Sequence, residues 1–298
     1  MARFLWQDLD DPNIQFKGSM VLTAQAAKTF AVVALVMNQS LFTAIPVIPA
    51  ELANAAPTVN MFAQVAVGDG FSTTFTLLNA GTETASGNLI LAGNDGTPLT
   101  VAFASPGQAN ALASSFLINV PPGGMQLITA SAVNPSDATI AGWARAESLG
   151  GFLRGVATFQ VLKENILKTI AGVLSADATN SATIPVNDNN TLLGGQSYAT
   201  GYAVANPGNE DVNIRITVLN ADGSVWKILD PPLLNPLKPG SHMARFLWQD
   251  LDDPNLQFKG SMVLTAQAAK TFAVVALVMN QGQFTAIPVI PKKGPETN

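Results

Sequence analysis

Few side chains in this sequence can do chemistry. Catalysis by a histidine dyad or triad needs an imidazole beside a nucleophile, and the chain has one histidine, His242. It has no cysteine, which excludes disulfide bonds and thiolate metal sites. His242 falls in a predicted strand beside Arg245, and we interpret it as a structural residue of that strand. The sequence therefore offers no catalytic residue and predicts a protein that is not an enzyme.

The strongest candidate for a metal site is the acidic cluster of Asp250, Asp252 and Asp253, which is repeated near the N-terminus. Alternating carboxylates are ligands that calcium prefers, but the cluster lacks the glycine and the bidentate glutamate of an EF-hand loop. An aspartate-rich turn before Pro254 is the favoured interpretation. Asp188, inside a polar run, is a weaker calcium candidate and is expected in a solvated loop. We predict no cofactor.

Aromatic side chains give a second kind of candidate site. Trp143 and Trp226 fall within predicted strands, whereas Trp248 and Tyr198 lie near predicted strand ends. Exposed aromatic rings can stack on sugars, so binding of a polysaccharide is one interpretation. Core packing or contact between domains is the favoured one.

Composition limits the class of protein. Charged residues make up 12% of the chain, against roughly 25% in a typical soluble domain, and the mean hydropathy is +0.27. The longest apolar run, Phe272–Met279, is far short of the roughly 20 residues of a membrane-spanning helix, so no membrane insertion is expected. A net charge of −5 with scattered lysines and arginines argues against nucleic acid. The low charge favours apolar surface that is covered by neighbours.

The chain contains one segment twice, since Met1–Pro49 recurs as Met243–Pro291. The three differences between the copies are Ile14 against Leu256, Ser40 against Gly282, and Leu41 against Gln283. Copies this long hold whole strands of a larger unit, which favours a function of length or multiplicity.

An older repeat lies inside the chain. Apolar runs at Phe71–Leu78 and Asn88–Leu91 precede an Asp-Gly turn at Asn94–Gly96. The same pattern recurs 127 residues later, where runs at Ala203–Ala205 and Val212–Leu219 precede Ala221–Gly223, and short strands separated by turn residues recur throughout both halves. This pattern predicts an all-β protein of two homologous antiparallel sandwiches. Leu162–Leu174 also fits a helical face, but its counterpart contains Gly282 and two prolines, so we predict a hairpin followed by an extended exit strand.

The predicted organisation follows from these repeats. Its parts are a partial sandwich (1–49), a linker (50–57), a first sandwich (58–178), a second sandwich (179–291) and a polar tail (292–298).

Several motifs resemble a known type of repeat. They are Leu237–Leu247, Phe258–Gly260, Ala273–Leu277, Phe284–Val289, Tyr202–Pro207 and Ala157–Phe159. Together they resemble the tandem β-sandwich repeats of large secreted or surface proteins of environmental bacteria. The resemblance implies an Ig-like topology and an extracellular location. Gly240–Met243 also matches a common expression-tag remnant, but its register with Pro122–Gln126 favours a native origin.

The duplicated segment suggests how the chain functions. A sandwich cut in two leaves unpaired strand edges and an open core, and residues 179–240 supply one complementary half for two near-identical segments. If one segment closes the sandwich, the other can complete a domain in the next subunit and build a filament or surface layer, or it can pair with a preceding repeat of a longer array. The rival hypothesis is a carbohydrate-binding or adhesive module, which Trp248 would serve. The expected assembly residues are Phe4, Trp6, Phe16, Val21, Phe30, Val32, Leu35 and Phe42.

Overall fold

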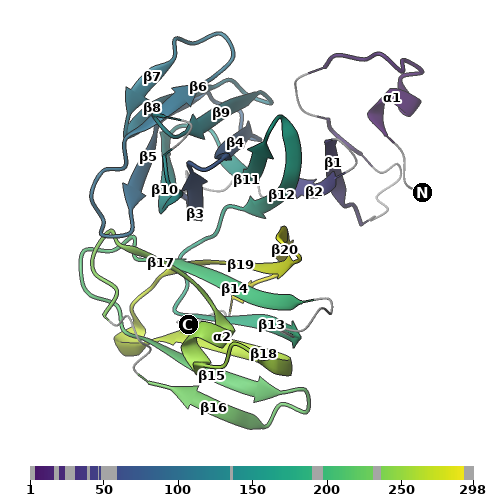
Figure 1. The fold of residues 1–298 in the computed structure, drawn as a ribbon. Coiled ribbons are helices and arrows are strands. Elements are labelled where there is room, and N and C mark those ends of the chain that lie inside the picture. The colour runs from purple at the N-terminus through teal and green to yellow at the C-terminus, as the bar shows by residue number, and fades with distance from the viewer. Residues whose placement is uncertain are drawn as a thin grey trace.

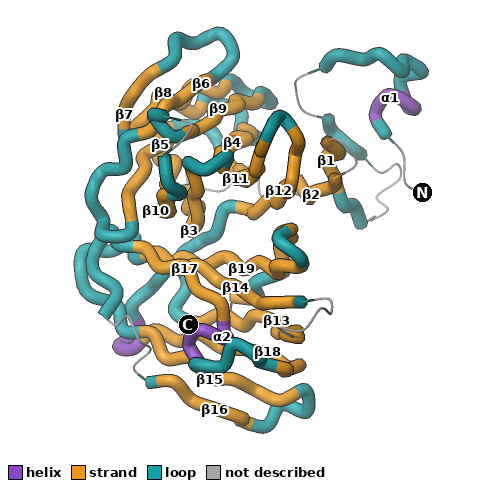
Figure 2. Tube along the Cα trace, viewed as in Figure 1, coloured by secondary structure: helices purple, strands orange, loops and turns teal. Residues whose placement is uncertain are grey.

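The computed structural model describes residues 4–16, 20–23, 31–38, 41–45, 47, 59–134, 137–189, 197–230 and 236–291. These residues are mostly antiparallel strands, as the all-β prediction requires (Figure 2). Two groups of strands lie one above the other, and a separate N-terminal hairpin lies beside the first group (Figure 1). No helix in the described part of the chain is long and apolar enough to cross a membrane.

The first group holds ten strands in two sheets. Its strands are β3 (Asn60–Val67), β4 (Phe71–Asn79), β5 (Ala85–Gly93), β6 (Val101–Ala104), β7 (Ala111–Ala113), β8 (Ser115–Val120), β9 (Met125–Ser131), β10 (Ile140–Leu149), β11 (Leu153–Lys163) and β12 (Ile166–Leu174). One sheet has the order β3-β10-β5-β8 and the other has the order β12-β11-β4-β9-β6-β7.

The second group repeats this order with fewer strands. Its elements are β13 (Ser181–Asn189), β14 (Tyr198–Ala205), β15 (Ile214–Asn220), β16 (Val225–Leu229), β17 (His242–Phe246), α2 (Leu247–Leu251), β18 (Gln257–Ala266), η2 (Gln267–Ala269), β19 (Ala273–Asn280), β20 (Gln283–Ile287) and β21 (Ile290–Pro291). The order β13-β18-β15-β16 matches β3-β10-β5-β8, and β20-β19-β14 with β17 on β14 matches β12-β11-β4-β9.

A buried asparagine marks the same corner of both groups. In the first group, Asn79 Nδ2 donates to the carbonyl oxygens of Glu83 at 2.7 Å and Val120 at 2.9 Å. Asn206 makes the same pair of bonds in the second group, at the same two distances. A buried amide must find partners for its donors, so this side chain fixes the two connections that meet at the corner.

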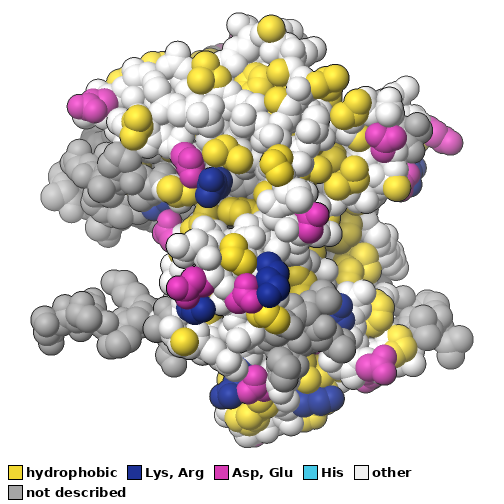
Figure 3. Space-filling model, turned by 90° about the vertical axis from the view of Figure 1, so that its left-hand side faces the viewer, with side chains coloured by type: hydrophobic (Ala, Val, Ile, Leu, Met, Phe, Trp, Pro, Cys, Tyr) yellow, Lys and Arg dark blue, Asp and Glu magenta, His cyan; other side chains and the backbone are white. Residues whose placement is uncertain are grey.

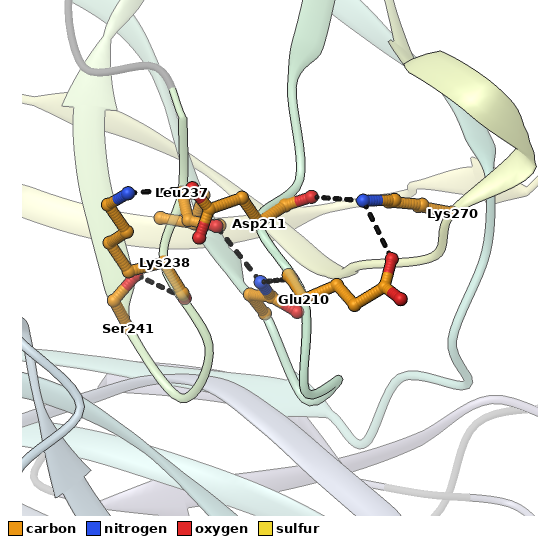
Figure 4. A network of polar contacts seen from close by, with 7 residues as sticks. Glu210, Asp211, Leu237, Lys238, Ser241 and Lys270 are labelled. Atoms are coloured by element: carbon orange, nitrogen blue, oxygen red, sulfur yellow. Dashed lines mark hydrogen bonds and ion pairs between the residues drawn. The ribbon is translucent and has the colours of Figure 1, made fainter.

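The second group adds ion pairs at this corner (Figure 4). Lys270 Nζ lies 2.9 Å from both Glu210 Oε2 and the Asp211 carbonyl oxygen, and Lys238 Nζ lies 2.6 Å from Asp211 Oδ2. Ser241 Oγ donates to the Lys238 carbonyl oxygen at 2.7 Å. These charges are solvent-exposed and each pair contributes under about 1 kcal/mol, so they order the loops more than they stabilise the fold.

The buried apolar side chains form two clusters. One fills the space between the two sheets of the first group and continues into Ala203, Ala205, Ala273 and Val275 of the second group, and the other lies within the second group. Side chains alternate between buried and exposed along β8, β9 and β15, which is the period of two that a half-buried strand requires. Phe62 and Phe75 meet edge to face at 5.1 Å in the first core. Ile184, Met262 and Leu264 are fully buried in the second.

The predicted hairpin within Leu162–Leu174 is confirmed. Strands β11 and β12 pair across Glu164 and Asn165, whose φ values of 54° and 61° are those of a type I′ turn. Strand β12 buries residues 167, 169, 171 and 173. This spacing of two fits a strand and not a helix.

Hydrogen bonds join the two groups. Trp143 Nε1 donates to the Gly240 carbonyl oxygen at 2.6 Å, and the His242 backbone N–H donates to the Asn94 carbonyl oxygen at 3.0 Å. Gly96 has a φ of +85°, and a Cβ there would lie 3.0 Å from the carbonyl carbon of Gly240. The first group therefore approaches the second backbone to backbone at this turn.

Candidate functional site

The C-terminal copy of the duplicated segment closes the second group. Its strand β18 pairs with β13 and β15, while β17 and β19 both pair with β14. Met262, Leu264 and Val275 of this copy are each at most 3% exposed. Of the two segments predicted to compete for residues 179–240, the C-terminal one occupies the position.

The N-terminal copy is left without these partners. Its described elements are a short helix, α1 (Leu5–Asp8), and a hairpin of β1 (Ala34–Asn38) and β2 (Leu41–Ile45). Met20, Leu22 and Val33, the counterparts of the three buried residues, are 58%, 49% and 82% exposed. The same apolar side chains are thus buried in one copy and exposed to solvent in the other.

Both copies form the same helical turn and the same stacked aromatic pair near their first residues. The Phe4 backbone N–H donates to Gln7 Oε1 at 2.7 Å, and Phe246 makes the equivalent bond to Gln249 at 2.8 Å. The Phe4 ring stacks on the indole ring two residues later, with centroids 6.4 Å apart, and Phe246 does the same at 6.3 Å. These contacts span two or three residues, so the sequence alone produces them. Strand pairing needs distant partners and differs between the copies.

The N-terminal hairpin contacts the first group. Strand β2 lies beside the edge strand β12, where the Gly172 backbone N–H donates to Thr43 Oγ1 (Figure 1). Thr43 is buried in this contact. Strand β20 of the C-terminal copy also reaches β12, since the Phe284 N–H donates to Thr169 Oγ1 at 2.8 Å.

Most predicted assembly residues are exposed. They are Phe4, Trp6, Phe16, Val21, Leu35 and Phe42. Val32 is partly buried, and Phe30 lies outside the described residues.

The weak calcium candidates Asp250, Asp252 and Asp253 make other contacts. The two carboxylate oxygens of Asp250 accept hydrogen bonds from Tyr202 Oη at 2.7 Å and Arg245 Nε at 2.5 Å. Asp252 caps helix α2 in the left-handed conformation, and Asp253 Oδ1 accepts the Asn255 N–H in a turn. Among the described residues no three acidic or histidine side chains come together as a metal site.

Burial controls the titration of Asp250 and its partner. Loss of solvent raises the pKa of Asp250 despite the opposing hydrogen bond from Tyr202 and the charge of Arg245. Burial, and next the Asp250 charge, raise the pKa of Tyr202 well above its usual value. The bonds of Asp250 to Tyr202 and Arg245 hold helix α2 against β14.

Asp188 corrects a sequence-based expectation. It is not in a solvated loop but in β13, where it is 1% exposed. Its Oδ1 accepts the Thr200 N–H at 2.7 Å, while Oδ2 is buried without a hydrogen-bond partner. Burial raises the pKa of Asp188 to about 6. The alternation of Ile184, Val186 and Asp188 along the strand was the signal that it points inward.

His242 lies at the junction of the two groups. Its Nδ1 is 2.8 Å from Asn94 Oδ1 and its Nε2 is 3.0 Å from Gln64 Oε1. Burial lowers the pKa of His242 to about 4, so the ring is neutral at pH 7. A neutral imidazole donates through one nitrogen and accepts at the other, so one of the two amides presents its NH₂ group. Among the described residues, the two printed partners of the ring nitrogens are side-chain amides.

The segment Gly240–Met243 takes part in the fold. The Gly240 N–H donates to the Asn206 carbonyl oxygen at 2.9 Å, as the Gly123 N–H does to that of Asn79. This is the register predicted from Pro122–Gln126.

The tryptophans divide differently from the prediction. Trp143 is buried, and Trp248 packs against the second core. Trp226, expected to be covered, is 44% exposed on the edge strand β16, where it stacks on Phe258 with centroids 4.6 Å apart. Val225 and Ile228 of the same strand are also exposed. The run lacks clean alternation, so its pattern does not indicate which face is covered.

Apolar exposure is not confined to one element. On the face shown in Figure 3, hydrophobic side chains are spread over the surface and charged ones are scattered among them. Comparisons with models of protein families, with curated proteins and with solved structures find no match for this chain.

Proposed function

We propose that the chain is a non-enzymatic extracellular structural repeat protein of tandem Ig-like sandwiches that assembles into a filament or surface layer. Assembly buries the N-terminal copy against strands equivalent to β13–β16 from a neighbouring molecule or repeat. The extracellular location is supported by the resemblance to surface repeat proteins described above.

One observation carries the proposal. Leu22 is 49% exposed whereas Leu264, its counterpart, is fully buried, and Met20 and Met262 differ in the same way. Full burial of one such side chain contributes about 1.5–3 kcal/mol, so several of them supply a strong drive for a complementary surface. Residues 20–23, which the structure describes outside any strand, can add directional backbone hydrogen bonds when they pair with a neighbouring strand.

The test is electron microscopy and sedimentation of the purified full chain. The wild type should form extended or layered assemblies as concentration rises. The variant Met20→Asp/Leu22→Asp should disperse, because complementation would bury both side chains and an unpaired charge there is unfavourable.

A matched control is available in the next residue. Thr23 corresponds to Thr265, which stays exposed in the completed copy, so Thr23→Asp should assemble like the wild type. Dispersed monomers of the wild type at high concentration, or equal assembly of all three proteins, would count against the proposal.

A carbohydrate-binding or adhesive module is the second candidate, and the exposed Trp226 favours it. One ring face stacks on Phe258, and the ring is 44% exposed. Sugar binding on a glycan array should then be lost in Trp226→Ala and kept in Trp248→Ala, because Trp248 packs on the core.

A further inference from the structure

Strand β12 is the meeting point of two hairpins that share one sequence. Thr43 Oγ1 accepts the N–H of Gly172, and Thr169 Oγ1 accepts the N–H of Phe284. Thr43 lies on β2 and accepts from β12, and Thr169 lies on β12 and accepts from β20. In both contacts the acceptor is a threonine on the second strand of a hairpin, and the donor is on the second strand of the next hairpin along the chain. Edge strands present unpaired N–H groups, and each threonine satisfies one of them.

The two outer hairpins are the same structure. Ala34 pairs with Ile45 in β1–β2 as Ala276 pairs with Ile287 in β19–β20, and every pair between them is in the same register. Two of the three sequence differences between the copies fall in this hairpin. At one of them, Leu41 of β2 is partly buried, whereas Gln283 of β20 is exposed.

The C-terminal hairpin keeps the group that the N-terminal hairpin uses for docking. Thr285, the counterpart of Thr43, is exposed, whereas Thr43 is 7% exposed. The contact of β20 with its own β12 engages the Phe284 N–H instead. A β19–β20 hairpin can therefore remain bound to its own chain and offer Thr285 to a second one.

We propose that the edge of β12 is a docking site for the β19–β20 hairpin of a second copy of this chain, and that β1–β2 occupies that site in cis. The occupant is identified by the near-identical hairpin already bound there. This inference deepens the proposed self-assembly, on which it rests, by naming one contact and the element that blocks it.

Tethering explains why the cis hairpin prevails. A segment joined to its target by a short linker acts at an effective concentration of about millimolar, well above that of a second molecule at micromolar concentration. Leu41 in place of Gln283 adds apolar contact to the cis hairpin. The N-terminal hairpin is therefore a cap that end-to-end association must displace.

The experiment weakens the cap within the full chain. Leu41→Gln gives the N-terminal hairpin the residue of its C-terminal counterpart, and Thr43→Val removes the acceptor for Gly172 at nearly constant volume. Sedimentation velocity of the double variant should show end-to-end association that is at least about tenfold tighter than in the wild type.

A third substitution tests the partner surface. Thr285→Val, added to the double variant, should return the association to the wild-type level, because it removes the hydroxyl that replaces Thr43 in trans. Thr285 is exposed, so the fold should not change. Hydrogen exchange at the Gly172 amide reports the cis contact directly and should speed up in Thr43→Val.

Each outcome decides the inference. Faster exchange at Gly172 without tighter association overturns it, as does association that Thr285→Val leaves intact, and unchanged exchange contradicts the docking contact itself. Failure of the proposed function is separate, because Met20→Asp/Leu22→Asp leaves this hairpin contact untouched. If only the hairpin inference holds, the wild type stays dispersed and the uncapped variant associates.

Discussion

Two buried titratable side chains respond to pH in opposite directions. Burial raises the pKa of Asp188 from 3.8 to about 6 and lowers the pKa of His242 from 6.5 to about 4. The folded Asp188 holds a proton that the unfolded chain has lost, so its contribution to stability falls as pH rises through that window. The unfolded chain holds the proton of His242 more tightly, so that contribution rises with pH from about 4 to 6.5. The two contributions oppose each other where the windows overlap.

Single substitutions should reveal each contribution. Between about pH 4 and 6 the unfolding free energy of the wild type should be nearly flat, whereas that of His242→Gln should fall with pH and that of Asp188→Asn should rise, each by roughly 1 kcal/mol per pH unit. Urea titrations at several pH values measure the slopes. Slopes of the same sign in the two variants would contradict these assignments.

At the scale of elements, the duplication separates local from distant causes of structure. The helical turn and the stacked aromatic pair form in both copies, since their contacts span three residues at most. Strand β18 pairs with β13 and β15, whereas the described counterparts of its residues, 15–16 and 20–23, lie in no strand. The positions of strands, turns and the β11–β12 hairpin were predictable from the alternation of apolar residues and from turn residues.

The docking of the N-terminal hairpin was not predictable. Thr43 and Gly172 are 129 residues apart, and neither has a pattern that names the other. The buried Asp188 was predictable from its alternation with Ile184 and Val186, although its polar neighbours suggested a loop. Sequence periodicity locates an element and its faces, while the choice of partner depends on shape and competition between segments.

One valine pair tests the difference between the copies. Val275→Asp should destabilise the fold by about 3–5 kcal/mol, because it places an unpaired charge in the apolar cluster that the two groups share, where Val275 is 3% exposed. Val33→Asp, the same change at the same place in the other copy, should alter unfolding by less than about 0.5 kcal/mol, since Val33 is 82% exposed. Urea unfolding followed by tryptophan fluorescence compares them. Equal effects would mean that both copies are packed.

For the whole molecule, the number of complementary parts limits how it can assemble. The described residues hold one set of strands β13–β16 and two segments able to complete it. If chains exchange segments, every set still binds one copy and one copy per chain stays exposed. Exchange by itself therefore leaves the buried area unchanged, so the assemblies expected of the purified chain must also bury the copy that stays exposed, by contact between molecules or against a further set of such strands.

A further set of strands equivalent to β13–β16 can be added to the chain. Residues 179–242 fused ahead of Met1 would place a complete second-group sequence, with three changes, before the linker. The amides of 20–23 and 31–36 should then become protected in hydrogen exchange, as those of 262–265 and 273–278 are expected to be. Assembly through the N-terminal copy should disappear. Unprotected amides in the fused chain would show that the copy has lost its ability to complete a sandwich.

The joint between the two groups has a mechanical consequence. Hydrogen bonds from Trp143 to Gly240 and from His242 to Asn94, together with the close approach at Gly96, hold one group against the other, so hydrogen bonding and packing set the angle between them. In any array that repeats this joint, a constant rotation accumulates from unit to unit. Such an array grows as a stiff screw whose pitch is set at a single turn, and a substitution at that turn would change the twist of the entire fibre.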